Sequence, residues 1–390
     1  MHVLIIPSEH FLTPKAPLAG IFQYHHARLL DDFGCKVGVL SAGFVKIMDS
    51  FDYPYLRYEL NDGIRIYRKY SKTFMPARLS VKFFSNYLIK LYVRLYKEYI
   101  RKNGIPDVLH AHNCLYAGAA ALEIKRQYGV PYVVTEHSSL YERNLIPKEQ
   151  LNVCKSVLEQ TDRITVVSTG LKKSLNRYFG KLVENAVPIY NVLEKEFIEG
   201  SINYQPIIEN NEKVVFLSIG SLDSNKNHTC LLEAFSTKFK GNQRFELIIG
   251  GSGPLRKELE EKSISLGISS QVLFLGHLKR KEVIDQIIKC DVFVLPSIVE
   301  TFGVVLIEAL ALGKPIISTL SGGPEDIVNE GNGILVSPND SDALANAIEN
   351  ISKNLQKFDK RNIREDCISR FGRDVFFERL MRIYKNIEGI

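Results

Sequence analysis

The chain alternates short apolar runs with longer segments in which apolar residues recur every three or four positions. The short runs have the length of buried strands, and the periodic segments are typical of amphipathic helices. This alternation predicts an α/β protein with parallel, doubly wound sheets. The expected strands lie at 3–6, 36–40, 64–67, 108–111, 132–135 and 163–167, and then at 214–219, 245–249, 272–275, 292–295, 316–319 and 333–336.

A polar, irregular stretch from Asn191 to Asn211 separates the two sets of strands. A chain of 390 residues is too long for one core, so we expect two domains, 1–191 and 192–371, with a hinge near Asn191 to Glu196. The tail after them is amphipathic and predicts a final helix. The chain contains no run of about 18 uncharged apolar residues, so we expect no membrane-spanning helix.

Cysteine usage favours a reducing compartment. The six cysteines are widely spaced, and they form no C-x-x-C pair and have no nearby histidine ligands. We therefore expect free thiols rather than a disulfide or zinc framework. The apolar start of the chain is too short and uncharged for a signal peptide. These features predict a cytoplasmic protein. The cysteines are Cys35, Cys114, Cys154, Cys230, Cys290 and Cys367.

The stretch from Pro296 to Gly303 carries the strongest sign of ligand chemistry. It follows the apolar run 292–295 and leads into an Ala- and Leu-rich helix expected at 304–312. The loop and the first helical turn offer backbone N–H groups that suit a phosphate. Glu300 and Glu308 can accept hydrogen bonds from hydroxyls on either side of that phosphate, which is the pattern of a nucleotide sugar. The alternative is an ordinary strand–helix junction with a capped, solvated helix.

A second candidate loop, Gly220 to Asn227, follows the apolar run 214–219 and precedes another apolar helix. A glycine-containing turn with a cation, Lys226, near a helix start suits a diphosphate. The alternative is a solvated loop lysine. The later loop 250–254 also lies between a strand and a helix, but Arg256 occupies the last glycine position of G-x-G-x-x-G, which disfavours NAD.

Three histidines lie near the carboxyl ends of two expected strands in the first half. His137 lies just past the strand at 132–135, where ligands bind in open α/β sheets. His110 and His112 end the preceding strand and are interpreted as structural. A nucleophilic triad is disfavoured for His137, because no serine or cysteine lies in a G-x-S-x-G context.

Glu300 and Glu308, with seven residues between them after Pro296-Ser297, resemble the E-x7-E motif of retaining glycosyltransferase family 4. Other motifs follow in that family's order over nearly the whole chain. The resemblance implies the GT-B fold, with two Rossmann-like doubly wound domains facing a central cleft. Domain 1–191 would hold the acceptor, domain 192–371 would bind the nucleotide sugar, and a helix at 372–390 would pack back on the first domain.

The resemblance also implies roles for individual residues. The catalytic set would be Lys226, which binds the leaving phosphate, Glu300, which positions sugar hydroxyls, and His137, which contacts the donor sugar. The donor-binding set would be Gly20, Gly220, Ser221, Lys226, Gly253, Glu300, Thr301, Phe302, Gly303, Val304 and Glu308. Ser221 stands where the family usually has an arginine, and serine cannot grip a phosphate in a bidentate manner. Asn227 stands where glycine is usual.

A metal cofactor is not expected. The D-x-D string that holds a cation in many nucleotide-sugar transferases occurs once, as Asp340-Ser341-Asp342 before a helix. Serine and aspartate at that place are typical of a helix cap and first turn. Lys226 and helix N-termini would then neutralise the leaving diphosphate.

Positive charge is concentrated in the first half. Residues 1–191 contain 26 Lys+Arg against 16 Asp+Glu, and the segment 57–102 contains 12 basic residues against three acidic ones, with interleaved aromatics. No nucleic-acid-binding module accompanies these residues. A basic, aromatic amphipathic helix at an anionic membrane face is one interpretation. The other is a solvated helix with its aromatic stripe in the core.

These patterns and the resemblance predict a retaining glycosyltransferase that moves a sugar from a UDP- or GDP-linked donor to a glycan or lipid-linked acceptor, in polysaccharide or glycolipid synthesis. We expect no nucleic-acid partner and a cytoplasmic location at the inner membrane face. The competing functions are a nucleotide-sugar-binding protein without transferase activity and a GT-B epimerase or phosphorylase.

Overall fold

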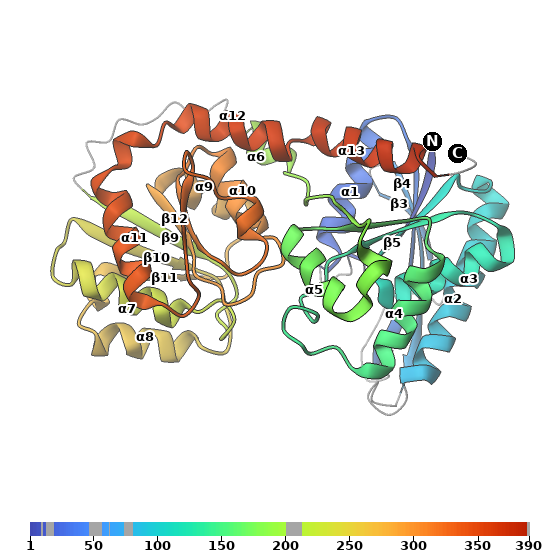
Figure 1. The fold of residues 1–390 in the computed structure, drawn as a ribbon, viewed down its shortest axis with the longest axis horizontal. Helices are drawn as coiled ribbons and strands as arrows, with labels where there is room; N and C mark the ends of the chain where they lie inside the picture. The colour runs from blue at the N-terminus through green and yellow to red at the C-terminus, as the bar shows by residue number, and fades with distance from the viewer. Residues whose placement is uncertain are drawn as a thin grey trace. The chain divides into compact units, whose positions relative to one another are not determined.

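The computed structural model of the chain describes residues 1–8, 11–12, 19–46, 57–61, 63–73, 81–199 and 213–387. It divides into two compact units (Figure 1). Unit 1 comprises Met1–Val167, Leu171–Val192 and Asp374–Ile390, and unit 2 comprises Ser168–Gly170 and Leu193–Arg373.

Unit 1 is built on an eight-stranded sheet in the order β3-β4-β2-β1-β5-β6-β7-β8. All neighbouring strands are parallel except β3, which runs antiparallel to β4. The strands are β1 His2–Ile6, β2 Lys36–Lys46, β3 Arg57–Asn61, β4 Ile64–Thr73, β5 Val108–His112, β6 Tyr132–Glu136, β7 Arg163–Val166 and β8 Val187–Pro188. The helices are α1 Ile21–Asp32, α2 Val81–Asn103, α3 Ala119–Tyr128, α4 Lys148–Gln160, α5 Thr169–Phe179 and α13 Arg373–Lys385.

The interpretation of the basic segment 57–102 as an amphipathic helix applies only to its second half, and the strand expected at 64–67 lies in its first half. That half forms a hairpin of β3 and β4, closed at Gly63 with a φ of 88°. Charged residues interrupt the apolar pattern of β4 in the sequence, because this strand buries a cation as well as apolar side chains. Arg68 is 2% exposed, and its Nε lies 2.6 Å from Glu59 Oε1.

The helical half of this segment, α2, separates its aromatic residues from its cations. Leu88, Tyr92, Leu95, Tyr96 and Tyr99 are buried in unit 1. Lys90, Arg94, Lys97 and Arg101 are exposed, at the spacing of one helix face. Tyr92, Tyr96 and Tyr99 are therefore core, whereas Tyr87 is 39% exposed, and the basic face is available to a partner. Phe74 and the side chains of Lys82, Phe83 and Phe84 lie outside the described residues.

Unit 2 is built on a six-stranded parallel sheet in the order β11-β10-β9-β12-β13-β14. The strands are β9 Val214–Ile219, β10 Phe245–Gly250, β11 Val272–Gly276, β12 Val292–Leu295, β13 Ile316–Thr319 and β14 Gly333–Val336. The helices are α6 Lys195–Glu199, α7 His228–Phe239, α8 Arg256–Ser265, α9 Arg280–Lys289, α10 Val304–Ala311, α11 Ser341–Lys353 and α12 Lys360–Phe371. Its core includes Phe216, Phe235 and Phe239.

The last helix, α13, completes the core of unit 1. Leu380, Ile383 and Tyr384 belong to the same buried cluster as Val3 and Ile5 of β1. Helix α13 lies beside α1 (Figure 1). Phe377 stacks on Phe33, the residue after α1, with ring centroids 4.3 Å apart. The two ends of the sequence thus share one hydrophobic core.

All six cysteines are free and buried. Among the described residues, no helix combines the length and apolar content that a membrane-spanning segment needs.

Candidate functional site

The sheet order of unit 2 brings the two predicted phosphate loops together. β9 and β12 are neighbours at the centre of the sheet. From β9 the chain continues to β10 toward one edge of the sheet, and from β12 it continues to β13 toward the other edge. Ligands of open α/β sheets bind outside the carboxyl ends of the strands at such a switch point. The loop 220–227 follows β9, and the loop 296–303 follows β12. Residues some 70 positions apart therefore form one site.

The loop after β9 is folded around Asp223. Asp223 Oδ1 accepts hydrogen bonds from the backbone N–H of Asn225 at 2.9 Å and of Lys226 at 3.1 Å. Ser221 Oγ donates to Asp223 Oδ2 at 2.6 Å. Burial by itself would raise the pKa of Asp223, but these hydrogen bonds outweigh it and lower the pKa. The Ser221 hydroxyl thus fixes the loop conformation.

Lys226 and Glu300 meet at the centre of the site. Lys226 Nζ lies 2.5 Å from Glu300 Oε2, and the two side chains are 21% and 15% exposed. Ser297 Oγ donates to the same carboxylate oxygen at 3.2 Å. Asn225 fixes the two loops to each other, since its side-chain N–H donates to Val299 O at 2.9 Å. The two predicted catalytic residues of unit 2 therefore form one ion pair.

The start of α10 is shaped by glycine. Gly303 caps the helix with a φ of 93°, a left-handed conformation that other residues rarely adopt. Phe302 is 2% exposed and packs on Phe371, so only its backbone is available to a ligand. A Cβ on Gly323 would lie 2.3 Å from Phe302 Cα. The backbone of Thr301 to Val304 is thus held at the carboxyl edge of β12.

Glu308 lies in the second turn of α10 and is held by a residue that sequence reasoning missed. Arg280 Nη2 donates to Glu308 Oε1 at 2.6 Å, and Arg280 Nε donates to Glu194 Oε2 at 2.9 Å. The guanidinium also lies over the ring of Phe197 at 4.4 Å. Burial raises the pKa of Glu308, and Arg280 counteracts part of that rise. Arg280 therefore fixes the direction of the Glu308 carboxylate.

The loop after β10 packs against the loop after β9. A Cβ on Gly253 would lie 2.4 Å from Leu222 O, and a Cβ on Gly251 would lie 1.8 Å from Gly220 O. The backbone N–H of Leu222 donates to Ser252 O at 2.9 Å. Gly253 is therefore required for close backbone packing. Gly220 itself lies under the stem of Lys226.

Gly20 and His137 belong to unit 1. Gly20 caps α1 with a φ of 75°. His137 follows β6, and its backbone N–H donates to Asn113 Oδ1 at 2.9 Å and to Glu136 Oε1 at 3.0 Å. Burial lowers the pKa of His137 to about 4, so its ring is neutral at physiological pH.

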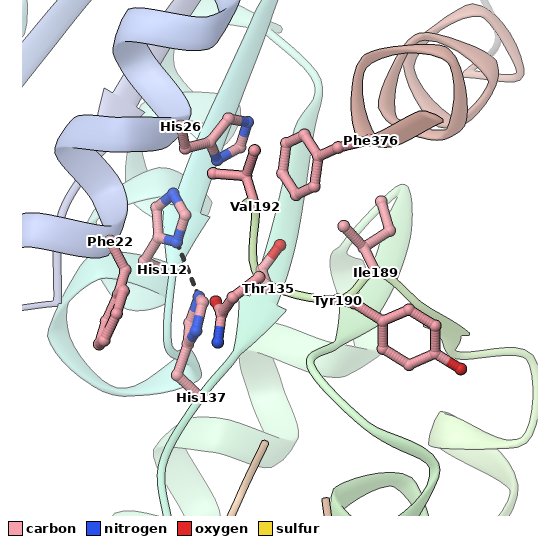
Figure 2. Close-up of a pocket in the computed structure, with 10 residues that line it drawn as sticks. Phe22, His26, His112, Thr135, His137, Ile189, Tyr190, Val192 and Phe376 are labelled. Atoms are coloured by element: carbon pink, nitrogen blue, oxygen red, sulfur yellow. Dashed lines mark hydrogen bonds between the residues drawn. The ribbon is translucent and has the colours of Figure 1, made fainter. Parts of the chain in front are cut away.

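His137 is the outermost ring of a histidine cluster. Its Nε2 lies 2.8 Å from His112 Nδ1, and Figure 2 shows the ring of His26 beyond that of His112. His110 stacks on His112 with ring centroids 4.8 Å apart. A cavity of about 20 Å³ adjoins the cluster and is also lined by Phe22 and Phe376. Burial lowers the pKa of all three inner histidines, that of His26 to about 3.

Ligand atoms of His26, His110 and His112 lie within 4.8 Å of one another, a spacing that could hold a metal ion. The hydrogen bonds argue against that use. Both ring nitrogens of His110 are engaged, with Tyr384 and Thr135, each at 2.6 Å. A metal would have to break one of these buried bonds.

Asp340 of the D-x-D string caps α11. Its Oδ1 accepts a hydrogen bond from the backbone N–H of Ala343 at 2.8 Å. This use matches the interpretation of the string as a helix cap.

Both parts of the chain match known protein families. Residues 20–196 match the model described as Glycosyltransferase Family 4, and residues 202–368 match the model described as Glycosyl transferases group 1. An uncharacterized glycosyltransferase of Methanocaldococcus jannaschii, MJ1607, is 28% identical over 72% of this chain and 75% of its own length. The putative teichuronic acid biosynthesis glycosyltransferase TuaC of Bacillus subtilis is 25% identical over 89% of this chain and 88% of its own.

The fold also resembles solved structures. The Anabaena protein HepE, solved in complex with UDP, matches with a TM-score of 0.72 at 19% identity, over 98% of this chain and 99% of that one. At that identity the likeness concerns the fold.

Replacing Arg280 with alanine should lower the melting temperature of the protein. The change leaves Glu308, which is 4% exposed, without its counter-charge, and an unsatisfied buried group costs on the order of 1–3 kcal/mol. Thermal unfolding followed by circular dichroism measures the loss. Adding Glu308→Gln to the variant should recover part of it. Lys281→Ala, an exposed neighbour on α9, is the control. Equal melting temperatures for Arg280→Ala and Lys281→Ala would contradict the assignment.

Proposed function

The two family matches, the two parallel-sheet units and the structural likeness support a group 1 glycosyltransferase with the GT-B fold, and we propose that it is a retaining enzyme. It transfers a sugar from a nucleoside-diphosphate sugar to a hydroxyl of a glycan or lipid-linked acceptor. The observation that carries the proposal is the Lys226–Glu300 pair at the switch point of unit 2, beside the start of α10.

The pair suits a donor that has both a diphosphate and sugar hydroxyls. Lys226 Nζ lies 2.5 Å from Glu300 Oε2, so an arriving diphosphate meets a cation that is already oriented. Glu300 has a second carboxylate oxygen, which can accept from a sugar hydroxyl. The backbone of Thr301 to Val304 and the start of α10 offer N–H groups to the same diphosphate. Glu308, aimed by Arg280, lies where it can accept from the ribose diol.

The reaction proceeds on one face of the sugar. The bond from the anomeric carbon to the diphosphate breaks, the bond to the acceptor oxygen forms on the same face, and the departing phosphate takes the acceptor proton. Lys226 and the α10 amides stabilise the charge that develops on the leaving oxygen. His137 of unit 1 contacts the donor sugar in this scheme. No protein nucleophile and no metal ion are required.

UDP is the first donor nucleotide to test, since HepE was solved with UDP, and polysaccharide synthesis is the first process to test, since TuaC is described by that role. A thermal-shift panel of UDP, GDP, ADP and their glucose conjugates should show stabilisation by one nucleotide family. Binding with no transfer to any acceptor would favour the second candidate, a nucleotide-sugar-binding protein. The engagement of Ser221 with Asp223 favours that candidate, since position 221 carries a hydroxyl and not a cation.

Lys226→Ala should lower kcat by about 10²- to 10³-fold with little change in donor binding. A cation that faces a leaving phosphate contributes most as charge develops in the transition state. Glu308→Gln should instead raise the donor KM, because the ribose contact exists in both the ground and the transition state. Steady-state kinetics with saturating acceptor separate the two effects. Lys213→Ala, just before the opposite end of β9, is the control. A kcat within about twofold of wild type for Lys226→Ala would refute the role of this lysine.

Chelation should leave transfer intact. Asp340 accepts from Ala343 N in the cap of α11, so Asp340→Ala should lower stability by about 1 kcal/mol and keep kcat. Asp340→Asn retains an acceptor oxygen and should keep both. The measurement is transfer rate in excess EDTA, with thermal unfolding of the variants. A strict need for added manganese or magnesium that Asp340→Ala abolishes would be incompatible with this mechanism.

We also propose that the basic face of α2 binds anionic membrane. Each exposed cation near such a surface contributes roughly 1 kcal/mol, and salt screens the attraction. The protein should sediment with phosphatidylserine-containing liposomes at low salt, dissociate at high salt and ignore neutral liposomes. Replacing Lys90, Arg94 and Lys97 with glutamate should abolish sedimentation. The same change at the exposed lysines Lys148, Lys155 and Lys173, on α4 and α5, should weaken it less. Wild type that ignores anionic liposomes at low salt would rule the contact out.

A further inference from the structure

A chain of hydrogen bonds inside unit 1 fixes where the proton of His110 lies. The hydroxyl of Thr165 has Val134 O as an acceptor at 3.2 Å, and we assign the proton of its 2.5 Å contact with Thr135 Oγ1 to Thr135. With its proton used, Thr135 Oγ1 accepts from His110 Nε2 at 2.6 Å. His110 is neutral, and its Nδ1 therefore accepts from the Tyr384 hydroxyl at 2.6 Å.

His112 lies two residues further along β5 and stacks on His110, with ring centroids 4.8 Å apart. Its Nδ1 lies 2.8 Å from His137 Nε2. Its Nε2 is buried, and none of the residues that the structure describes hydrogen-bonds to it. His112 is neutral and carries one proton, which can lie on either ring nitrogen.

The two positions of the His112 proton differ in cost. On Nε2 it would be a buried donor without a described partner, and such orphaned N–H groups are rarer than orphaned acceptors. On Nδ1 it donates to His137 Nε2, and only a lone pair is left unmatched at Nε2. An unmatched buried donor is the rarer arrangement, so we assign the proton to Nδ1. His137 Nε2 is then an acceptor, and the single proton of neutral His137 lies on Nδ1.

We propose that His112 is a positioning residue that fixes His137 as the Nδ1–H tautomer, so that His137 presents a hydrogen-bond donor to a substrate oxygen. The proposal rests on the proposed function for the identity of that oxygen, a hydroxyl or phosphate oxygen of a nucleotide sugar. The buried hydrogen-bond network fixes which ring nitrogen of His137 carries the proton. His137 can therefore donate to the substrate through Nδ1, but it cannot act as a base there.

This role also explains why His110 and His112 differ although they are neighbours on one strand face. His110 has both ring nitrogens committed, to Thr135 of β6 and to Tyr384 of α13. His112 has only one committed nitrogen, and that one leads to His137. His26 lies edge-on to His112 with ring centroids 5.2 Å apart (Figure 2). It belongs to the cluster but has no described hydrogen bond to His137, which makes it a matched control position.

The direct test is long-range ¹H–¹⁵N NMR of the full chain labelled at histidine, which distinguishes the two neutral tautomers by their nitrogen shifts. His137 and His112 should show the Nδ1–H pattern, and His110 should show the Nε2–H pattern. His137→Gln identifies the His137 signals. An Nε2–H pattern for His137 in wild type would overturn the proposal, whatever the activity.

Two variants of similar size test the role of His112. His112→Asn keeps an N–H donor near the position of Nδ1, and His112→Leu removes it. The asparagine variant should keep the His137 tautomer and a kcat within about threefold of wild type. The leucine variant should convert His137 to a mixture of tautomers and lower kcat at least tenfold, with the His110 pattern unchanged. His26→Leu should leave the His137 tautomer unchanged.

The outcomes separate this proposal from the proposed function. A leucine variant that keeps the His137 tautomer, or that shifts it and keeps full kcat, would overturn the role of His112. The expected NMR patterns in a protein that transfers no sugar to any acceptor would uphold the tautomer assignment and overturn the proposed function alone. An unfolded leucine variant leaves the wild-type and asparagine spectra as the deciding measurements.

Discussion

The contact between Lys226 and Glu300 depends on one constraint, the strand order of the unit 2 sheet. Parallel strands place all their carboxyl ends at one edge, and the pairing of β9 with β12 puts two particular loops side by side there. The rest of the site follows from that pairing. Asn225 fixes the loops to each other, Gly303 starts α10 beside them, and α10 carries Glu308 one turn further in.

Much of this arrangement could be predicted from the sequence, because buried parallel strands are short apolar runs with clear ends. The runs at 214–219, 292–295, 316–319 and 333–336 correspond to β9, β12, β13 and β14 at both ends. The run at 64–67 predicts only the first part of β4, and β3 is not predicted, because the buried Arg68 of this hairpin is stabilised by Glu59 across the strands. That pairing exists only once the chain is folded.

In the site, too, some residues could be predicted from the sequence and others could not. Lys226 and Glu300 carry local motifs, so their neighbourhood could be predicted. Arg280 and Glu194 carry none: one begins a helix and the other lies in a connecting segment, and only the fold brings both to Glu308. The direction of the proton on His137 could not be read from the sequence either. It depends on which ring nitrogen of His112 has a hydrogen-bond partner, and only the folded structure shows that.

The packing of α13 into unit 1 has a consequence for how the protein is made. Domains generally fold during synthesis as their residues leave the ribosome. Unit 1 must wait, because Leu380, Ile383 and Tyr384 are translated after unit 2, and they pack on β1 residues that are translated before it. The apolar face of unit 1 that α13 covers therefore stays open while unit 2 is being translated. This chain order implies a folding step in which α13 docks onto unit 1 after unit 2 has been made. It also implies a use for a chaperone that shields apolar surface during synthesis.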